Sequence, residues 1–133
     1  MPALQPTVRY LILSEDVQAD AGNHARVTLS GLISSIHSLG QPPFPLVYPE
    51  LCVFIQLSEC RGPAEGRVEI QHADSGETVF RTRTRTIPFD NDPLEVVGVI
   101  FRMRNCLFQL PGLYWVQFWY NEQAIAQQPL VLR

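Results

Sequence analysis

The sequence predicts an all-β fold in which two antiparallel sheets form a sandwich of about seven or eight strands. Turn-forming residues recur at short spacing between apolar segments, and eleven prolines argue against long helices. Strand-like segments follow one another without the 3.6-residue apolar period of a helix. The chain has 133 residues, of which 46% are hydrophobic and 17% charged, so we expect a single folded domain over residues 1–133.

The first two expected strands lie in the N-terminal quarter of the chain. Val8–Leu13 is apolar except for one arginine and ends in the polar segment Ser14–Asp16, which predicts a loop. In Arg26–Ser35, apolar residues and Gly31 share one parity while threonine and serine occupy the other. This alternation predicts a strand buried on one face.

A proline-rich segment separates these strands from the next. Residues 40–49 contain four prolines, which cannot donate to a ladder, so we expect an irregular crossover that Phe44 and Tyr48 attach to the core. Leu51–Leu57 begins apolar at both parities. Burial on both faces predicts a central strand.

A hairpin is the clearest local prediction. The strand through Val68–His72 is followed by Asp74-Ser75-Gly76 and then by a return strand over Thr78–Ile87. This spacing predicts a hairpin with Gly76 in the left-handed conformation, where the missing Cβ removes the steric cost.

Three more strands complete the predicted fold. A long strand over Val96–Phe108 is expected to bend at Gly98. Pro111-Gly112 then turns the chain into a strand over Leu113–Tyr120, and a strand over Ala124–Leu132 closes the domain.

Several segments together resemble a group of known families. They are Ser14–Val17, the strand Val27–Ile33, the crossover at Phe44-Pro45, and the turn Pro111-Gly112 with the aromatic Tyr114. The chain is similar in these segments to small bacterial immunoglobulin-like β-sandwich domains of unknown function. The resemblance implies an immunoglobulin-like fold and brings no activity or catalytic residue with it.

Five arginines are candidates for an interaction surface. Arg81, Arg83 and Arg85 alternate with threonines, so one continuous strand would present three guanidinium groups on one face. Arg102 and Arg104 share a parity on the next strand, and pairing of the two strands would gather all five into a patch suited to carboxylates or phosphates. The alternative is a solvated face, or an edge that like charges protect from pairing with other sheets.

The strand over residues 113–120 is aromatic at both parities. Its two stripes are Tyr114, Val116, Phe118 and Tyr120 on one face, and Trp115, Gln117 and Trp119 on the other. If the second stripe faces outward, it forms a flat aromatic platform beside a polar amide, suited to a protein partner or a sugar face. The alternative is that these rings are also covered, by a loop such as residues 40–49.

The sequence contains no recognisable catalytic, cofactor or metal motif. The histidines are scattered, and the cysteines lack metal-ligand spacing, so we expect reduced thiols packed in the core. These residues are His24, His37, His72, Cys52, Cys60 and Cys106. Asp90, Asp92 and Glu95 could offer oxygen ligands to calcium, but their spacing favours a solvated turn.

These observations lead to expectations about function and partners. We expect a non-enzymatic protein-interaction or assembly module that acts through a sheet surface. Its partner would be a second copy in a homodimer or another protein, and the alternative is a small-molecule or carbohydrate-binding sandwich. The net charge of −3 argues against nucleic acid as a partner. The short apolar runs predict no membrane partner and a cytoplasmic location.

Overall fold

The structure is a computed structural model that describes residues 5–20, 22, 26–60, 62–87 and 94–133. These residues form ten strands and no helix, which confirms the all-β prediction. No element of this described part is a helix long and apolar enough to cross a membrane.

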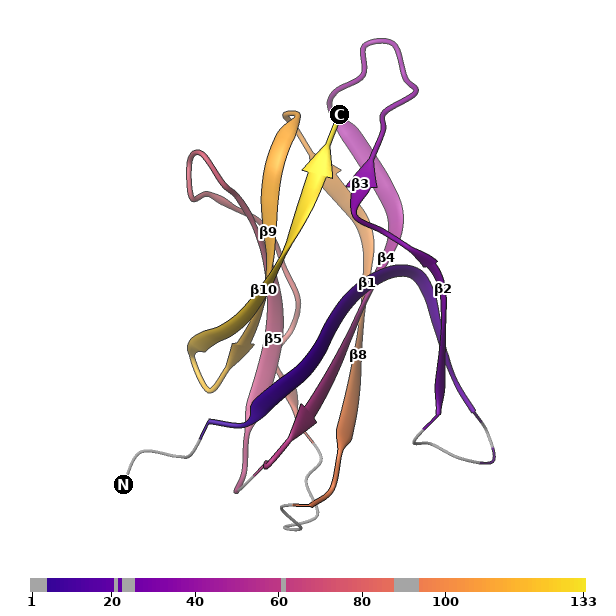
Figure 1. Ribbon diagram of the computed structural model, residues 1–133. Helices are drawn as coiled ribbons and strands as arrows, with labels where there is room; N and C mark the ends of the chain where they lie inside the picture. Colours follow the sequence, from indigo (N-terminus) through magenta and orange to yellow (C-terminus); the bar gives the residue numbers. More distant parts are fainter. Residues whose placement is uncertain (1–4, 21, 23–25, 61, 88–93) are drawn as a thin grey trace.

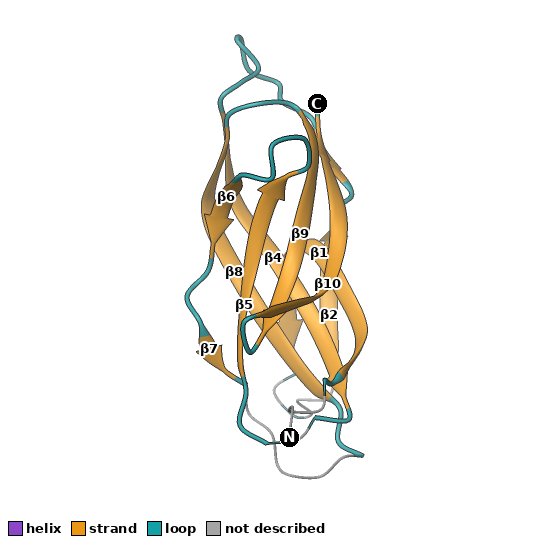
Figure 2. Cartoon of the chain, turned by 90° about the vertical axis from the view of Figure 1, so that its left-hand side faces the viewer, coloured by secondary structure: helices purple, strands orange, loops and turns teal. Residues whose placement is uncertain are grey.

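The strands form two sheets (Figures 1 and 2). The first sheet has the order β2 (Val27–Leu32), β1 (Thr7–Ala19), β4 (Leu46–Ser58) and β8 (Val97–Phe108). The second has the order β3 (Ser35–Ile36), β10 (Gln123–Leu132), β9 (Gly112–Tyr120), β5 (Glu65–His72) and β6 (Thr78–Arg81), and β7 (Arg85–Thr86) also pairs with β5. All of these pairings are antiparallel except that of β3 with β10.

The core lies between the two sheets and is filled by alternate residues of each. On β4, Leu51, Val53 and Ile55 are fully buried in the main core, and on β9, Val116 and Phe118 meet them from the other sheet. The intervening residues of β4 are buried too, because they form a second, smaller cluster on the outer face of the first sheet. β4 lies between β1 and β8, so the predicted central strand is confirmed.

The second cluster exists because β1 is longer than predicted. The expected loop at Ser14–Asp16 is wrong: β1 continues to Ala19 and pairs with β2, and Val17 packs on Cys52 and Phe54. The contact of Val17 with Cys52 and Phe54 stabilises the strand beyond the polar residues Ser14–Asp16. The local sequence does not predict this contact, because Cys52 and Phe54 lie on β4. Figure 1 shows β1 and β2 extending together beyond the neighbouring strand β4.

The return strand of the hairpin is also different from the prediction. Gly76 has φ +70°, as expected, but the predicted strand over Thr78–Ile87 is divided into β6 and β7. At the break, the Val68 amide donates to the Thr82 hydroxyl oxygen at 2.9 Å. A side chain thus takes the acceptor position of a backbone carbonyl, which interrupts the ladder.

The proline-rich crossover is shorter than predicted. Phe44 and Tyr48 pack against the main core, as expected, but β4 already begins at Leu46. Pro49 is tolerated inside β4 because the pairing with β1 starts only at Cys52, so one side of β4 is an edge at this position. The three cysteines are buried free thiols, which confirms their predicted packing role.

Candidate functional site

The alternating burial of β9 decides which aromatic stripe faces outward. Tyr114, Val116, Phe118 and Tyr120 are buried in the core. Trp115, Gln117 and Trp119 lie on the opposite face and are half-buried. The predicted outward stripe is therefore present in the structure.

Strand β5 places a second row of polar residues beside this stripe. Arg67 is opposite Trp119, Glu69 is opposite Gln117, and Gln71 is opposite Trp115. Directly opposed residues of an antiparallel pair share a face of the sheet and have Cβ atoms about 5 Å apart. We call these six residues the tryptophan face.

The buried carboxylate of Glu69 holds Arg67 of this face and the neighbouring Arg81 in place. Glu69 is only 2% exposed, and its Oε2 lies 2.6 Å from Nε of Arg67 and 3.3 Å from Nε of Arg81. Arg67 also reaches Glu122 at 2.9 Å. The hydrogen bond with Glu69 raises the pKa of Arg67 above its ordinary value, so its guanidinium stays charged.

The Trp119 side chain is oriented by polar contacts. The Arg67 guanidinium lies over the Trp119 ring, 4.6 Å from its centroid. The Trp119 Nε1 donates to Gln117 at 3.1 Å, and Gln117 Nε2 donates to Gln127 of β10 at 3.3 Å. This network holds the Trp119 ring and the amide groups of Gln117 and Gln127 together on one surface.

The structure does not bring the five predicted arginines together. Arg81 flanks the tryptophan face, and Arg83 is exposed in the break between β6 and β7. Arg85 instead donates to the Ile100 carbonyl, with its guanidinium 5.2 Å from the Phe101 ring centroid. The ladder fails because the strand is interrupted at Thr82.

Arg102 and Arg104 belong to the other side of the molecule. The premise of a five-arginine patch was that their strand pairs with the strand of Arg81, but β8 pairs with β4 and β6 with β5. Arg102 binds Asp16 at 2.9 Å and donates to the Val17 carbonyl. Its hydrogen bond lowers the pKa of Asp16. Arg102 therefore links β8 to β1 within the first sheet. Arg104 is exposed on the same strand, β8.

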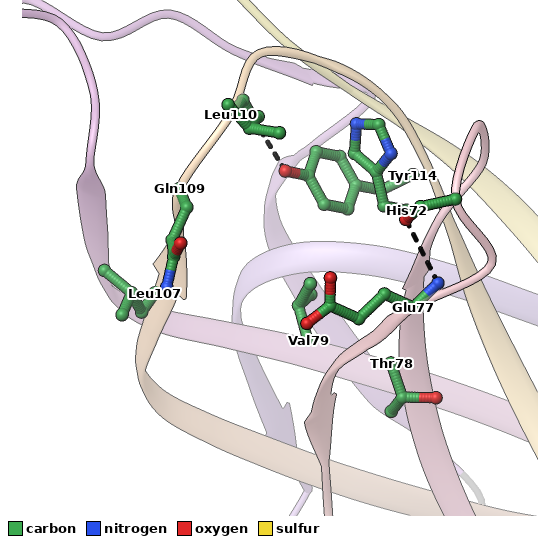
Figure 3. A pocket seen from close by; sticks show the side chains of 9 residues that line it. His72, Glu77, Thr78, Val79, Leu107, Gln109, Leu110 and Tyr114 are labelled. Carbon is green, nitrogen blue, oxygen red and sulfur yellow. Dashed lines mark hydrogen bonds between the residues drawn. The ribbon is translucent and has the colours of Figure 1, made fainter.

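The sequence pattern missed a pocket at one end of the sheets. We call it the end pocket; it lies between the β5–β6 hairpin and the β8–β9 turn and has a volume of about 190 Å³ (Figure 3). His72 packs edge-on against Tyr114 with ring centroids 4.8 Å apart, and the Tyr114 hydroxyl donates to the Leu110 carbonyl at 2.6 Å. Its lining residues come from two segments about 30 positions apart in the chain. A sequence motif within either segment therefore cannot predict the pocket.

The remaining candidate ligands do not converge where the structure describes them. Within the described residues there is no group of three or more histidine, cysteine or acidic side chains that could hold a metal ion. His24, Asp90 and Asp92 lie outside the described residues. The expected solvated turn at these residues therefore stays a prediction.

The chain is similar to one family model and to a solved structure. No curated protein matches it. A family model described as "Family of unknown function (DUF6941)" matches residues 9–133. Among solved structures, the chain is similar to Pseudomonas fluorescens alkylpurine DNA glycosylase AlkC bound to DNA containing an abasic site analog, with a TM-score of 0.49 and 14% sequence identity. The match covers 75% of this chain and 28% of that chain.

This likeness corrects the expectation about partners. We expected a second copy or another protein and excluded nucleic acid, whereas the similar chain is bound to DNA. The exclusion of nucleic acid is withdrawn, and no finding supports a homodimer. DNA binding itself is a property of that protein, and the matched region spans only 28% of its length.

Proposed function

Since this chain belongs to DUF6941, a family of unknown function, we propose its role from its own surface: a non-enzymatic binding module whose tryptophan face receives a neutral glycan. The observation that carries the proposal is the outward stripe of Trp115, Gln117 and Trp119, set beside the polar row of β5.

The chemistry of the tryptophan face favours a sugar. The face of an indole ring carries partial negative charge, which attracts the weakly positive C–H groups on the flat side of a pyranose. Because the Arg67 guanidinium lies over one face of Trp119, a sugar would contact the other face of that ring. The amides of Gln71, Gln117 and Gln127 offer donors and acceptors to hydroxyl groups next to the rings. Flat rings and neighbouring amides together match a ligand that has apolar faces and polar edges.

The charges of the face favour a neutral ligand over an acidic one. Arg67 and Arg81 are paired with Glu69, and Arg67 also with Glu122, so two positive and two negative groups balance locally. An acidic protein surface would have to compete with these carboxylates for the arginines. These ion pairs therefore favour a neutral glycan as the ligand over an acidic protein surface.

The length of the stripe indicates an oligosaccharide. Trp115 and Trp119 are four residues apart on β9, a separation of about 13 Å along a strand. Only a ligand longer than a single sugar can contact both indoles. Because the Trp119 indole and the amides of Gln117 and Gln127 are already held by hydrogen bonds, these three side chains lose little entropy on binding.

We also propose that the two sheets form an immunoglobulin-like sandwich. The Tyr114 hydroxyl bonds back to the carbonyl of Leu110, four residues upstream at the start of a strand. A tyrosine that ties the chain to itself in this way at a sheet corner is typical of immunoglobulin-like domains. A two-sheet arrangement of this kind presents one open sheet face, as the proposed glycan site requires.

The test is calorimetric titration of the protein with neutral hexasaccharides of glucose and of N-acetylglucosamine. Both tryptophans of the chain lie on this face, so ligand-induced quenching of intrinsic fluorescence reports the same event. Loss of one stacked ring is worth about 0.5–1.5 kcal/mol, so Trp115→Ala or Trp119→Ala should weaken binding about 2- to 10-fold. Circular dichroism checks that each variant is folded.

The matched control is Tyr10→Ala. Tyr10 is 51% exposed on β1 in the other sheet, and its removal should leave the dissociation constant unchanged. The glycan proposal is wrong if no hexasaccharide gives saturable binding, or if Tyr10→Ala weakens binding as much as the tryptophan variants do.

A further inference from the structure

Hydrogen bonds hold the two walls of the end pocket, which are the β5–β6 hairpin and the β8–β9 turn. The hairpin wall is closed by two backbone hydrogen bonds: the His72 amide donates to the Glu77 carbonyl at 2.9 Å, and the Gly76 amide donates to the His72 carbonyl at 2.8 Å. The Ala73 amide donates to the Leu113 carbonyl at 2.9 Å, which ties this hairpin to β9. The bond from Tyr114 to Leu110 holds the opposite wall. The pocket is therefore formed without a ligand.

Glu77 is the acidic residue among the described residues that line the pocket. Glu77 is exposed, and Figure 3 shows its carboxylate turned toward the space between Tyr114 and the β8 wall. No arginine is among the described residues that line the pocket, so no guanidinium neutralises this carboxylate there. Proximity of Glu77 also contributes to the raised pKa of Tyr114, whose main cause is burial.

The rest of the lining offers an apolar contact and a neutral hydrogen-bonding group. Val79, Leu107 and Leu110 supply apolar surface around the carboxylate, and the Gln109 side chain adds an amide. A ligand complementary to these groups carries a positive hydrogen-bond donor at one end and a short hydrocarbon stem at the other.

We propose that the end pocket binds an alkylammonium group, with the ammonium on Glu77 and the stem against Val79, Leu107 and Leu110. The volume of about 190 Å³ corresponds to about six water molecules, and so to a ligand portion of about six non-hydrogen atoms. A free primary amine and a lysine side chain both present this chemistry. The proposal is independent of the tryptophan face, which lies on the outer surface of the second sheet.

The test follows backbone amide resonances of the full chain during titration with n-pentylammonium at pH 8.0. We expect saturable shifts confined to the hairpin at residues 72–79 and the turn at 107–114. Pentan-1-ol has the same number of non-hydrogen atoms but no charge, and it should bind about 2- to 5-fold more weakly because it cannot form an ion pair with the exposed Glu77 carboxylate. A blocked Gly-Lys-Gly peptide, titrated in parallel, shows whether a lysine side chain is accepted as well as a free amine.

Two variants separate the carboxylate from general effects. Glu77→Gln keeps the shape of the side chain and should weaken n-pentylammonium binding about 2- to 5-fold, because the carboxylate is exposed to solvent. Glu65→Gln removes the same charge from an exposed position at the far end of β5 and should leave binding unchanged. The proposal is overturned if pentan-1-ol binds as tightly as n-pentylammonium, if Glu77→Gln has no effect, or if the shifts lie outside the two segments.

Discussion

Replacing Glu69 with glutamine removes the charge on which the tryptophan face is organised. The carboxylate is 2% exposed and contacts Arg67 at 2.6 Å and Arg81 at 3.3 Å. Glutamine has nearly the same shape, so the packing of β5 against its neighbours is retained. The variant therefore isolates the electrostatic contribution of the carboxylate.

The magnitude follows from what the arginines lose. Removing one partner of a fully buried ion pair destabilises a protein by about 3–5 kcal/mol, because the other charge is left uncompensated. Arg67 is 12% exposed and keeps its contact with Glu122, whereas Arg81 is 61% exposed and is readily hydrated. These two features reduce the expected loss to about 2 kcal/mol in the free energy of unfolding.

The assay is urea denaturation followed by circular dichroism and by tryptophan fluorescence. With a urea dependence of about 2 kcal/mol per molar, the midpoint should fall by about 1 M, and the melting temperature by about 5–12 °C. Glu122→Gln is the control, since its carboxylate is 79% exposed and pairs with the same arginine; it should cost less than about 0.5 kcal/mol.

A second comparison separates charge from packing. Replacing Arg67 and Glu69 together by leucine removes both charges, and the loss should be smaller than the sum of the two single replacements. If Glu69→Gln is no more destabilising than Glu122→Gln, the buried carboxylate does not compensate the guanidinium groups and the reasoning is refuted.

Two further predictions concern the thiols and the other sheet. Burial raises the pKa of the Cys60 and Cys106 thiols to about 11, so at pH 8 neither thiol should react with a thiol reagent within minutes in the native protein. All three cysteines should react in guanidinium chloride, and rapid labelling of Cys60 or Cys106 in the native protein would contradict this prediction. The pKa of Asp16 is lowered below 3.8 by the hydrogen bond from Arg102, so its stabilising contribution is complete above about pH 3.8 and is lost as the pH falls through the lowered value. Asp16→Asn should show a weaker loss of stability than the unmodified chain between pH 5 and pH 2, and parallel pH curves would exclude the pair as a source of acid sensitivity.

The sequence predicted local geometry correctly where a single residue type, or the two-residue alternation of a strand, determines that geometry. Gly76 has the left-handed backbone that its place in the hairpin predicted. On β9 the two-residue period separated Trp115 and Trp119 from the buried stripe, because a pleated strand directs successive side chains to opposite faces. The sequence could not say which stripe is inward, since both are aromatic.

Predictions that depended on partners elsewhere in the chain were less secure. Ser14–Asp16 is polar and favours a loop, but the strand continues because Val17 meets Cys52 and Phe54 from β4. The arginine ladder fails because the Thr82 side chain replaces a backbone acceptor opposite Val68. Both outcomes depend on groups more than ten residues away.

The sequence alone therefore determined the all-β class, the hairpin at Gly76 and the two stripes of β9, because each depends on the conformational preference or alternation of neighbouring residues. The tertiary structure decided that Arg67 and Glu69 lie beside the tryptophans, that Arg102 and Arg104 lie on the other sheet, and that the end pocket exists. The physical reason is that strand pairing and register join residues distant in sequence. Which strands become neighbours is decided by burying one core between both sheets, not by any local pattern.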